Sequence, residues 1–158
     1  MGRAILSRIL KSRAISYFNN SKAVIRILSD SSNPGRVMVV DDEVDIVFVI
    51  RRHLERWGFS VDTFTDPNHA LQTFKDYPDR YSVALLDIRM PEMSGIELAN
   101  RILKIKAHMK IVIMTAFEIE PHELATNLPM VKRDDILRKP FTLTQVCNAV
   151  KKKLKMHG

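Results

Sequence analysis

The sequence predicts an α/β domain in which an open parallel sheet carries helices on both faces. Short apolar runs alternate along the chain with longer segments whose apolar residues recur at helical spacing. The run 37–40 is continuously apolar, which is typical of a strand buried on both faces. Alternation of this kind indicates strands that are joined by helical crossovers and therefore run parallel.

Five segments are predicted as strands. Each is short, is rich in apolar or β-branched residues and is bounded by polar or turn-forming residues. The last of them is the weakest candidate. The predicted strands are 36–40, 59–64, 82–86, 110–114 and 135–138.

Helices are predicted where capping residues flank an amphipathic pattern. Gly58 supplies a stop signal for the first helix, Asp66 and Pro67 supply a cap and a first residue for the second, and Thr142 caps the last. The stretch between two prolines near residue 125 has room for a short helix of about two turns. The predicted helices span 44–55, 67–74, 94–105, part of 121–129 and 143–155.

The composition is that of one globular domain and excludes several classes of protein. The chain has 158 residues, of which 27% are charged and 46% hydrophobic. Its sequence has no apolar run of the roughly 18 residues that a membrane-spanning helix needs. Its one cysteine, Cys147, cannot form an internal disulfide, and its five histidines are scattered. A lone thiol fits a reducing compartment, so we expect a cytoplasmic location.

The positive charge is concentrated at the amino-terminal end of the chain. The net charge is +7 overall, but residues 1–33 hold six basic residues and one acidic residue, which leaves +2 for 34–158. A nearly balanced domain lacks the basic stripe of a nucleic-acid surface. We therefore expect no direct contact with nucleic acid.

Residues 1–33 are predicted to be a basic extension of the globular domain 34–158. The turn-forming segment 29–35 marks the boundary. We expect the extension to be poorly ordered or weakly helical. Two alternatives stay open: an amphipathic helix within 1–28 that makes weak contact with a membrane surface or a partner, and a cleaved targeting peptide.

Polar side chains stand where the predicted strands end. Asp41 and Asp42 follow the first strand, Asp87 the third, Thr115 the fourth and Lys139 the fifth. The carboxyl ends of parallel strands meet at one edge of the sheet, where ligands bind. Crowded carboxylates need a compensating cation, and Mg²⁺ prefers oxygen ligands. The sequence therefore predicts a magnesium site at this edge.

Four motifs resemble those of one family. They are Val-Val-Asp-Asp-Glu at 39–43, Asp-Ile-Arg-Met-Pro-Glu-Met-Ser-Gly at 87–95, Thr-Ala at 115–116 and Lys-Pro-Phe at 139–141. In these motifs the chain from Pro34 to Lys155 resembles a receiver domain of the two-component response regulators. The resemblance implies a flavodoxin-like sheet with the strand order 2-1-3-4-5.

The resemblance also implies which residues bind the metal. Asp42 would bind Mg²⁺ directly and Asp41 would bind it through water. Asp87 and the backbone carbonyl of Arg89 would complete the protein ligands. The metal would neutralise the charge that opposes attack of a carboxylate on a phosphoryl group.

Three side chains would handle the phosphoryl group. The resemblance implies that Asp87 is the phosphoacceptor, attacking the phosphorus of a phosphohistidine to form an acyl phosphate. Lys139 would pair with a phosphoryl oxygen as a compact point charge. Thr115 would donate a hydrogen bond to another phosphoryl oxygen and so act as a switch.

The sequence departs from the family pattern at several positions. Ile136 stands at the second switch position, where an aromatic residue is usual, and 130–133 lacks the usual glycine-alanine pair. The resemblance implies that Arg89 and Phe117 flank the path of the water that hydrolyses the acyl phosphate. Both are large, so we expect a long-lived phosphorylated form. The alternative is that both side chains face solvent and serve partner docking.

The resemblance implies a phosphorelay protein that is not an enzyme toward outside substrates. Its expected partners are a sensor histidine kinase or histidine phosphotransfer protein, and a downstream protein target that the sequence does not identify. Only 140–158 follows Lys139, so we expect no DNA-binding output domain after it. The alternative is a phosphorylation-independent interaction module with the receiver fold.

Overall fold

The computed structural model describes residues 36–119, 122 and 126–155. The predicted extension of residues 1–33 lies outside these residues, so its predicted conformation stays a prediction. Within the described residues, no helix is long and apolar enough to cross a membrane.

The described domain is built on five parallel strands, as predicted. Their order across the sheet is β2-β1-β3-β4-β5, which is the order that the resemblance implied. Because β1 and β3 are central, their carboxyl ends lie side by side. The strands are β1 (Arg36–Val40), β2 (Ser60–Phe64), β3 (Tyr81–Asp87), β4 (Lys110–Thr115) and β5 (Ile136–Arg138).

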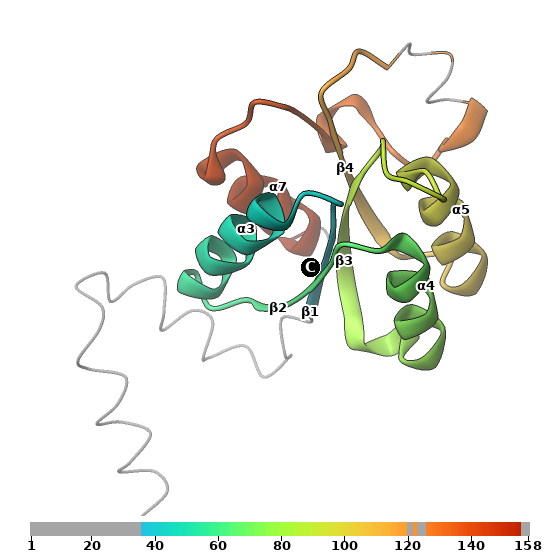
Figure 1. Ribbon diagram of the computed structural model, residues 1–158, viewed down its shortest axis with the longest axis horizontal. Coiled ribbons are helices and arrows are strands. Elements are labelled where there is room, and N and C mark those ends of the chain that lie inside the picture. The colour runs from blue at the N-terminus through green and yellow to red at the C-terminus, as the bar shows by residue number, and fades with distance from the viewer. Residues whose placement is uncertain (1–35, 120–121, 123–125, 156–158) are drawn as a thin grey trace, which may run out of the picture. The chain divides into compact units, whose positions relative to one another are not determined.

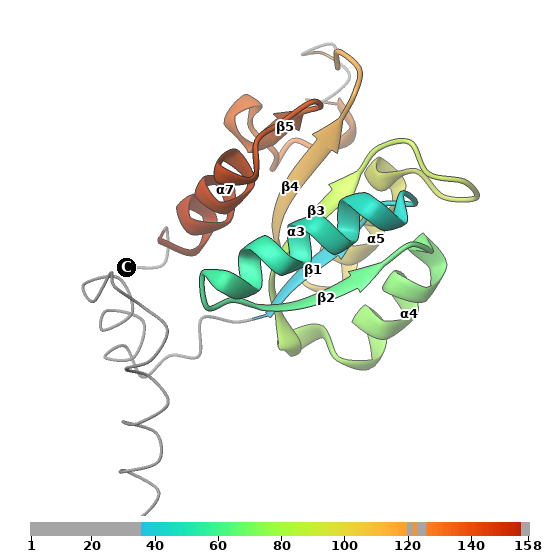
Figure 2. The same ribbon diagram turned by 60° about the vertical axis from the view of Figure 1, so that its left-hand side comes forward.

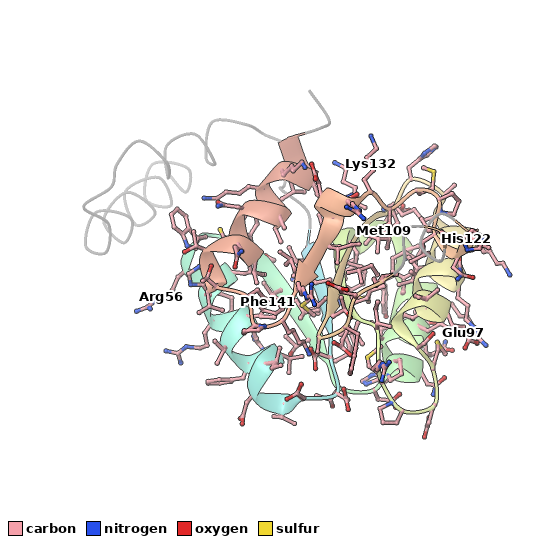
Figure 3. The ribbon with its side chains drawn as sticks, turned by 90° about the horizontal axis from the view of Figure 1, so that it is seen from above. Arg56, Glu97, Met109, His122, Lys132 and Phe141 are labelled. Atoms are coloured by element: carbon pink, nitrogen blue, oxygen red, sulfur yellow. The ribbon has the colours of Figure 1, made fainter. Side chains whose placement is uncertain are left out.

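Two pairs of helices cover the two faces of the sheet. Helices α3 (Val44–Arg56) and α7 (Leu143–Lys155) lie on one face, and α4 (Pro67–Asp76) and α5 (Gly95–Ile105) on the other (Figure 1). The view in Figure 3 shows Arg56 of α3 and Glu97 of α5 on opposite sides of the molecule. Helix α7 also packs beside α3, as Figure 2 shows.

The apolar core is divided into two layers by the sheet. Val37 and Val39 of β1 belong to the layer under α3 and α7, whereas Met38 and Val40 belong to the layer under α4 and α5. Side chains of a strand alternate between faces, so a strand with apolar residues at every position must be covered twice. All four of these side chains are at most 1% exposed.

Local signals set the helix boundaries near the positions that the sequence predicts. The Asp66 carboxylate accepts a hydrogen bond of 2.7 Å from the backbone N–H of Asn68, with Pro67 as the first residue of α4. The Ser94 hydroxyl accepts one of 3.1 Å from the N–H of Glu97 at the start of α5. Gly58 follows α3 with a φ of 85°, a left-handed conformation that glycine adopts without strain.

The segment between β4 and β5 differs most from expectation. Residues 122 and 126–127 are helical and 128–129 are not, whereas the other residues of the span 121–129 lie outside the described residues. A single 3₁₀ turn, η2 (Arg133–Asp135), precedes β5 and shortens that strand by one residue relative to the prediction. Another 3₁₀ turn, η1 (Pro78–Arg80), precedes β3 and was not predicted.

Candidate functional site

Three aspartates come together at the carboxyl edge of the sheet. Asp41 and Asp42 follow β1 and Asp87 ends β3, and one carboxylate oxygen from each lies within 4.8 Å of the others. Asp41 is fully buried and Asp87 is 5% exposed, whereas Asp42 is exposed. The sequence prediction that these carboxylates converge is thus matched by the geometry.

Lys139 provides the positive charge within this cluster. Its ammonium nitrogen lies 2.8 Å from Oδ2 of Asp41 and 2.9 Å from Oδ1 of Asp87. It also lies 3.3 Å from Oε1 of Glu43, a contact that the sequence analysis missed although Glu43 is part of the motif at 39–43. Lys139 comes directly after β5, and its peptide bond to Pro140 is cis.

Burial and pairing shift the pKa of both partners. Burial is the largest influence on Asp41 and raises the pKa of its carboxyl group, although the hydrogen bond from Lys139 opposes the rise. Burial by itself lowers the pKa of Lys139, but hydrogen bonds to Asp41 and Asp87 outweigh it and raise the pKa. Lys139 is therefore a permanent cation at neutral pH.

Both carboxylate oxygens of Asp41 have partners within the protein. Oδ1 accepts a hydrogen bond of 3.0 Å from the backbone N–H of Glu43, which turns the chain toward α3. Oδ2 is bonded to Lys139. Asp42 instead is exposed. Of the two, Asp42 is the more accessible ligand for a metal.

The loop after β3 is held tightly against the phosphoacceptor candidate. The backbone N–H of Arg89 donates a 2.8 Å hydrogen bond to Oδ2 of Asp87, and Gly95 donates one of 2.9 Å to the carbonyl of Ile88. A Cβ atom at Gly95 would collide with the backbone carbonyl of Asp87. The glycine of the motif at 87–95 is therefore required by close packing.

Glu92 in the same loop has a left-handed backbone. Its φ is 66°, which is uncommon for a residue with a side chain. The side-chain amide of Asn68 on α4 donates a 2.7 Å hydrogen bond to the Glu92 carboxylate. This bond ties the loop after Asp87 to a neighbouring helix.

Thr115 ends β4 near the acidic cluster but its hydroxyl is turned to its own loop. The hydroxyl oxygen accepts a 3.0 Å hydrogen bond from the backbone N–H of Phe117 and lies 3.2 Å from the Phe117 carbonyl. The side chain is 3% exposed. Ile136, the other predicted switch residue, is half-buried and packs against the core layer under α4 and α5.

Arg89 and Phe117 form a contact that sequence reasoning did not predict. The Arg89 guanidinium carbon lies 3.6 Å from the centroid of the Phe117 ring, which is a cation–π contact. Both residues are exposed. The sequence analysis placed them on two sides of the path to Asp87, and their contact joins the loops that follow β3 and β4.

The donor set of the cluster fits a divalent cation of the magnesium type. Asp41, Asp42 and Asp87 together bring three carboxylates against the one ammonium of Lys139. Hard oxygen donors and an exposed side that retains water are what Mg²⁺ requires. Whether the carbonyl of Arg89 joins these ligands stays a prediction.

Comparisons with known proteins point to one family. The sequence model of the response regulator receiver domain matches residues 37–151. The chain is 32% identical over 119 residues to the response regulator receiver protein CpdR of Brucella abortus, covering 75% of this chain and 96% of CpdR. It is also 32% identical over 116 residues to the alkaline phosphatase synthesis transcriptional regulatory protein PhoP of Bacillus subtilis, covering 73% of this chain and 47% of PhoP.

The chain spans about half the length of the transcriptional regulators that it matches. Among solved structures, a response regulator receiver domain protein from Clostridium thermocellum has a TM-score of 0.65 and 27% identity, covering 77% of this chain and 95% of that one. A CheY-like receiver domain protein from Methanospirillum hungatei has a TM-score of 0.67 and covers 77% of this chain and 94% of that one. Its 23% identity supports the fold alone.

Proposed function

This chain belongs to the response regulator receiver domain family, and from that membership we propose that it takes a phosphoryl group on Asp87 within a phosphorelay. Receiver domains are signalling proteins rather than classical enzymes. The observation that carries the proposal is the pairing of a nearly buried Asp87 with Lys139 at 2.9 Å, within a cluster of three carboxylates. We keep the expected cytoplasmic location as part of the proposal.

Phosphoryl transfer needs a carboxylate nucleophile that is ionised and fixed in position. An oxygen of Asp87 attacks phosphorus, the bond from phosphorus to the donor histidine nitrogen breaks, and that nitrogen keeps the electron pair. The product is an acyl phosphate on Asp87. A bound Mg²⁺ would neutralise charge on the phosphoryl oxygens, with Asp42 and Asp87 as its direct carboxylate ligands and Asp41 bound through water.

Lys139 is positioned to follow the developing charge. Before transfer its ammonium is shared between Asp41 and Asp87. After transfer the Asp87 oxygen is bonded to phosphorus and has lost its negative charge, and the nearest new anion is the phosphoryl group. We propose that Lys139 then pairs with a phosphoryl oxygen while keeping Asp41 as its second partner.

Thr115 is proposed to report the phosphoryl group to the rest of the domain. Its hydroxyl is bonded to the backbone of Phe117, and donating to a phosphoryl oxygen requires that bond to break. The loop that begins at Ala116 would then lose its anchor. Phosphorylation would shift the balance between two loop conformations and so change partner binding.

We propose that the phosphodonor is a sensor histidine kinase or a histidine phosphotransfer protein. Such a partner must bring its phosphohistidine to Asp87 and must therefore cover the adjoining surface. Val44 and Phe48, at the start of α3 directly after the acidic motif, are 66% and 57% exposed. They lie four residues apart on one helix face and offer apolar contact beside the site.

Phosphorylation by a small acyl phosphate tests the proposal without knowledge of the donor. The full chain is incubated with acetyl phosphate and Mg²⁺, and its intact mass is measured. One added phosphoryl group is expected for the wild type and none for Asp87→Asn. Asp66→Asn, which changes an exposed aspartate at the start of α4, is the matched control and should be labelled normally.

A phosphorylation-independent interaction module with the same fold is the alternative. It predicts no labelling, and equal partner binding by the wild type and Asp87→Asn. The cluster of three carboxylates around Lys139 favours the phosphoacceptor, because a merely structural site has no need of crowded like charges.

A further inference from the structure

A hollow of about 220 Å³ lies at the opposite edge of the sheet from the acidic cluster. It is lined by residues 107–111 before and at the start of β4, by residues 130–131 before η2, and by one residue of α7. Lys110 begins β4 and Thr115 ends it, so the two edges are about 16 Å apart along this strand. The hollow is therefore separate from the site at Asp87.

The floor of the hollow is apolar. Met109, Ile111 and Val131 line it and are 5%, 2% and 5% exposed. Met130, also in the lining, is 64% exposed. An unbranched thioether side chain at a rim adapts its shape to a small apolar guest.

The two lysines of the lining differ in whether a carboxylate pairs with them. The ammonium of Lys153 on α7 lies 2.7 Å from the Asp135 carboxylate, so it already has an anionic partner. Within the part of the chain that the structure describes, Lys110 forms no ion pair with a carboxylate. Burial and the charge of Lys153 both lower the pKa of Lys110. A half-buried cation in this position gains from an anion.

We propose that this hollow binds a small organic monocarboxylate whose carboxylate pairs with Lys110 and whose apolar body rests on Met109 and Val131. One uncompensated ammonium matches one negative charge, whereas a phosphate dianion would need a second. The body fits a single ring, because cavities of about 150 Å³ accept benzene. Nucleotides and larger cofactors occupy sites of roughly 300 Å³ or more, which is larger than this hollow.

Benzoate is the probe for this proposal, with benzyl alcohol as its neutral counterpart of similar shape. The full chain is labelled at its methionine methyl groups and titrated while the signals of Met109 and Met130 are followed by NMR. We expect a saturable shift of both signals with benzoate, and a dissociation constant at least about tenfold weaker for benzyl alcohol. Equal affinities would overturn the role of charge, and the absence of saturation would overturn the site.

Two variants test the residues. Lys110→Met should weaken benzoate binding about tenfold, while Lys104→Met, on the exposed side of α5, should leave it unchanged. Met130→Glu puts a competing carboxylate at an exposed rim position and should likewise weaken benzoate binding, which keeps the proposal testable if Lys110→Met fails to fold. Unchanged affinity in Met130→Glu, or in a folded Lys110→Met, would contradict the proposal.

Two further measurements separate a monocarboxylate site from a general anion site and from a site coupled to Asp87. Inorganic phosphate at the same concentration should displace little benzoate, and equal competition would overturn the monocarboxylate class in favour of a general anion site. Asp87→Asn should bind benzoate as the wild type does, because the hollow and the acidic cluster are independent. Loss of benzoate binding in Asp87→Asn would contradict that independence.

Discussion

The guanidinium carbon of Arg89 lies 3.6 Å from the ring centroid of Phe117, so that the loops after β3 and β4 are joined beside Asp87. Hydrolysis of an acyl phosphate on Asp87 needs a water in line with the bond that breaks. The resemblance to receiver domains implies that residues 89 and 117 flank this approach, and the Phe117 ring offers a water no hydrogen-bond partner. The contact supports the expectation of a long-lived phosphorylated form.

The Arg89→Asn, Phe117→Glu double variant should therefore lose its phosphate several-fold faster than the wild type. The measurement is the first-order decay of phosphorylated protein in Mg²⁺ without partners. Arg101→Asn, which removes an exposed arginine paired with Glu97 on α5, is the control and should decay at the wild-type rate. If the double variant decays no faster, the two side chains serve partner docking instead.

Lys139 should be needed for the stability of the unphosphorylated domain. Replacing it with methionine leaves two buried carboxylates without their cation, which costs about 3–5 kcal/mol of unfolding free energy. Urea unfolding at pH 7 without Mg²⁺ measures the loss. Adding Asp41→Asn to Lys139→Met should recover part of the loss, and strictly additive losses would show that the two residues do not interact.

Asp42 should contribute more to magnesium affinity than Asp41. Both oxygens of Asp41 are already bonded, to the N–H of Glu43 and to Lys139, whereas Asp42 is exposed. Calorimetric titration with Mg²⁺ should show a larger loss of affinity for Asp42→Ala than for Asp41→Ala. The reverse order would place Asp41 in direct contact with the metal.

The charge on Lys110, at the other edge of the sheet, should lower the folding stability of the domain in a pH-dependent way. Burial, aided by the charge of Lys153, lowers its pKa in the folded state below the ordinary value of 10.5. Folding disfavours the charged form of Lys110, so this form lowers the free energy of unfolding. The loss of stability is fully present below the folded-state pKa and disappears as pH rises toward 10.5. Lys110→Met should be more stable than the wild type at pH 7, and the difference should shrink at alkaline pH. A difference that stays constant with pH would assign the gain to packing rather than charge.

The positions of the aspartates were predictable because they depend on short local patterns. A buried strand that ends in an acidic residue is visible in the sequence at Asp41 and at Asp87, and parallel strands align their carboxyl ends. The strand order that the family resemblance implied is also confirmed. That order was predictable because the motifs at 39–43 and 87–95 resemble those of a family with one fold.

Contacts between distant loops were not predictable. The bond between Lys139 and Asp41 joins residues 98 positions apart, and its length and its sharing with Glu43 depend on how β5 docks on β4. The contact of Arg89 with Phe117 depends on side-chain directions in two loops. No periodic pattern carries such information, so the hollow at Lys110, which three segments form together, was likewise not predicted.

The central claim is that Asp87 carries the phosphoryl group, and locating the modified residue tests it most directly. After incubation with acetyl phosphate and Mg²⁺, borohydride reduction converts an aspartyl phosphate to homoserine, and peptide mass spectrometry identifies its position. The account predicts homoserine at position 87 alone, with Asp41 and Asp42 unmodified. Homoserine at position 41 or 42 with an intact Asp87, or none at all after the protein has gained a phosphoryl group, would contradict it.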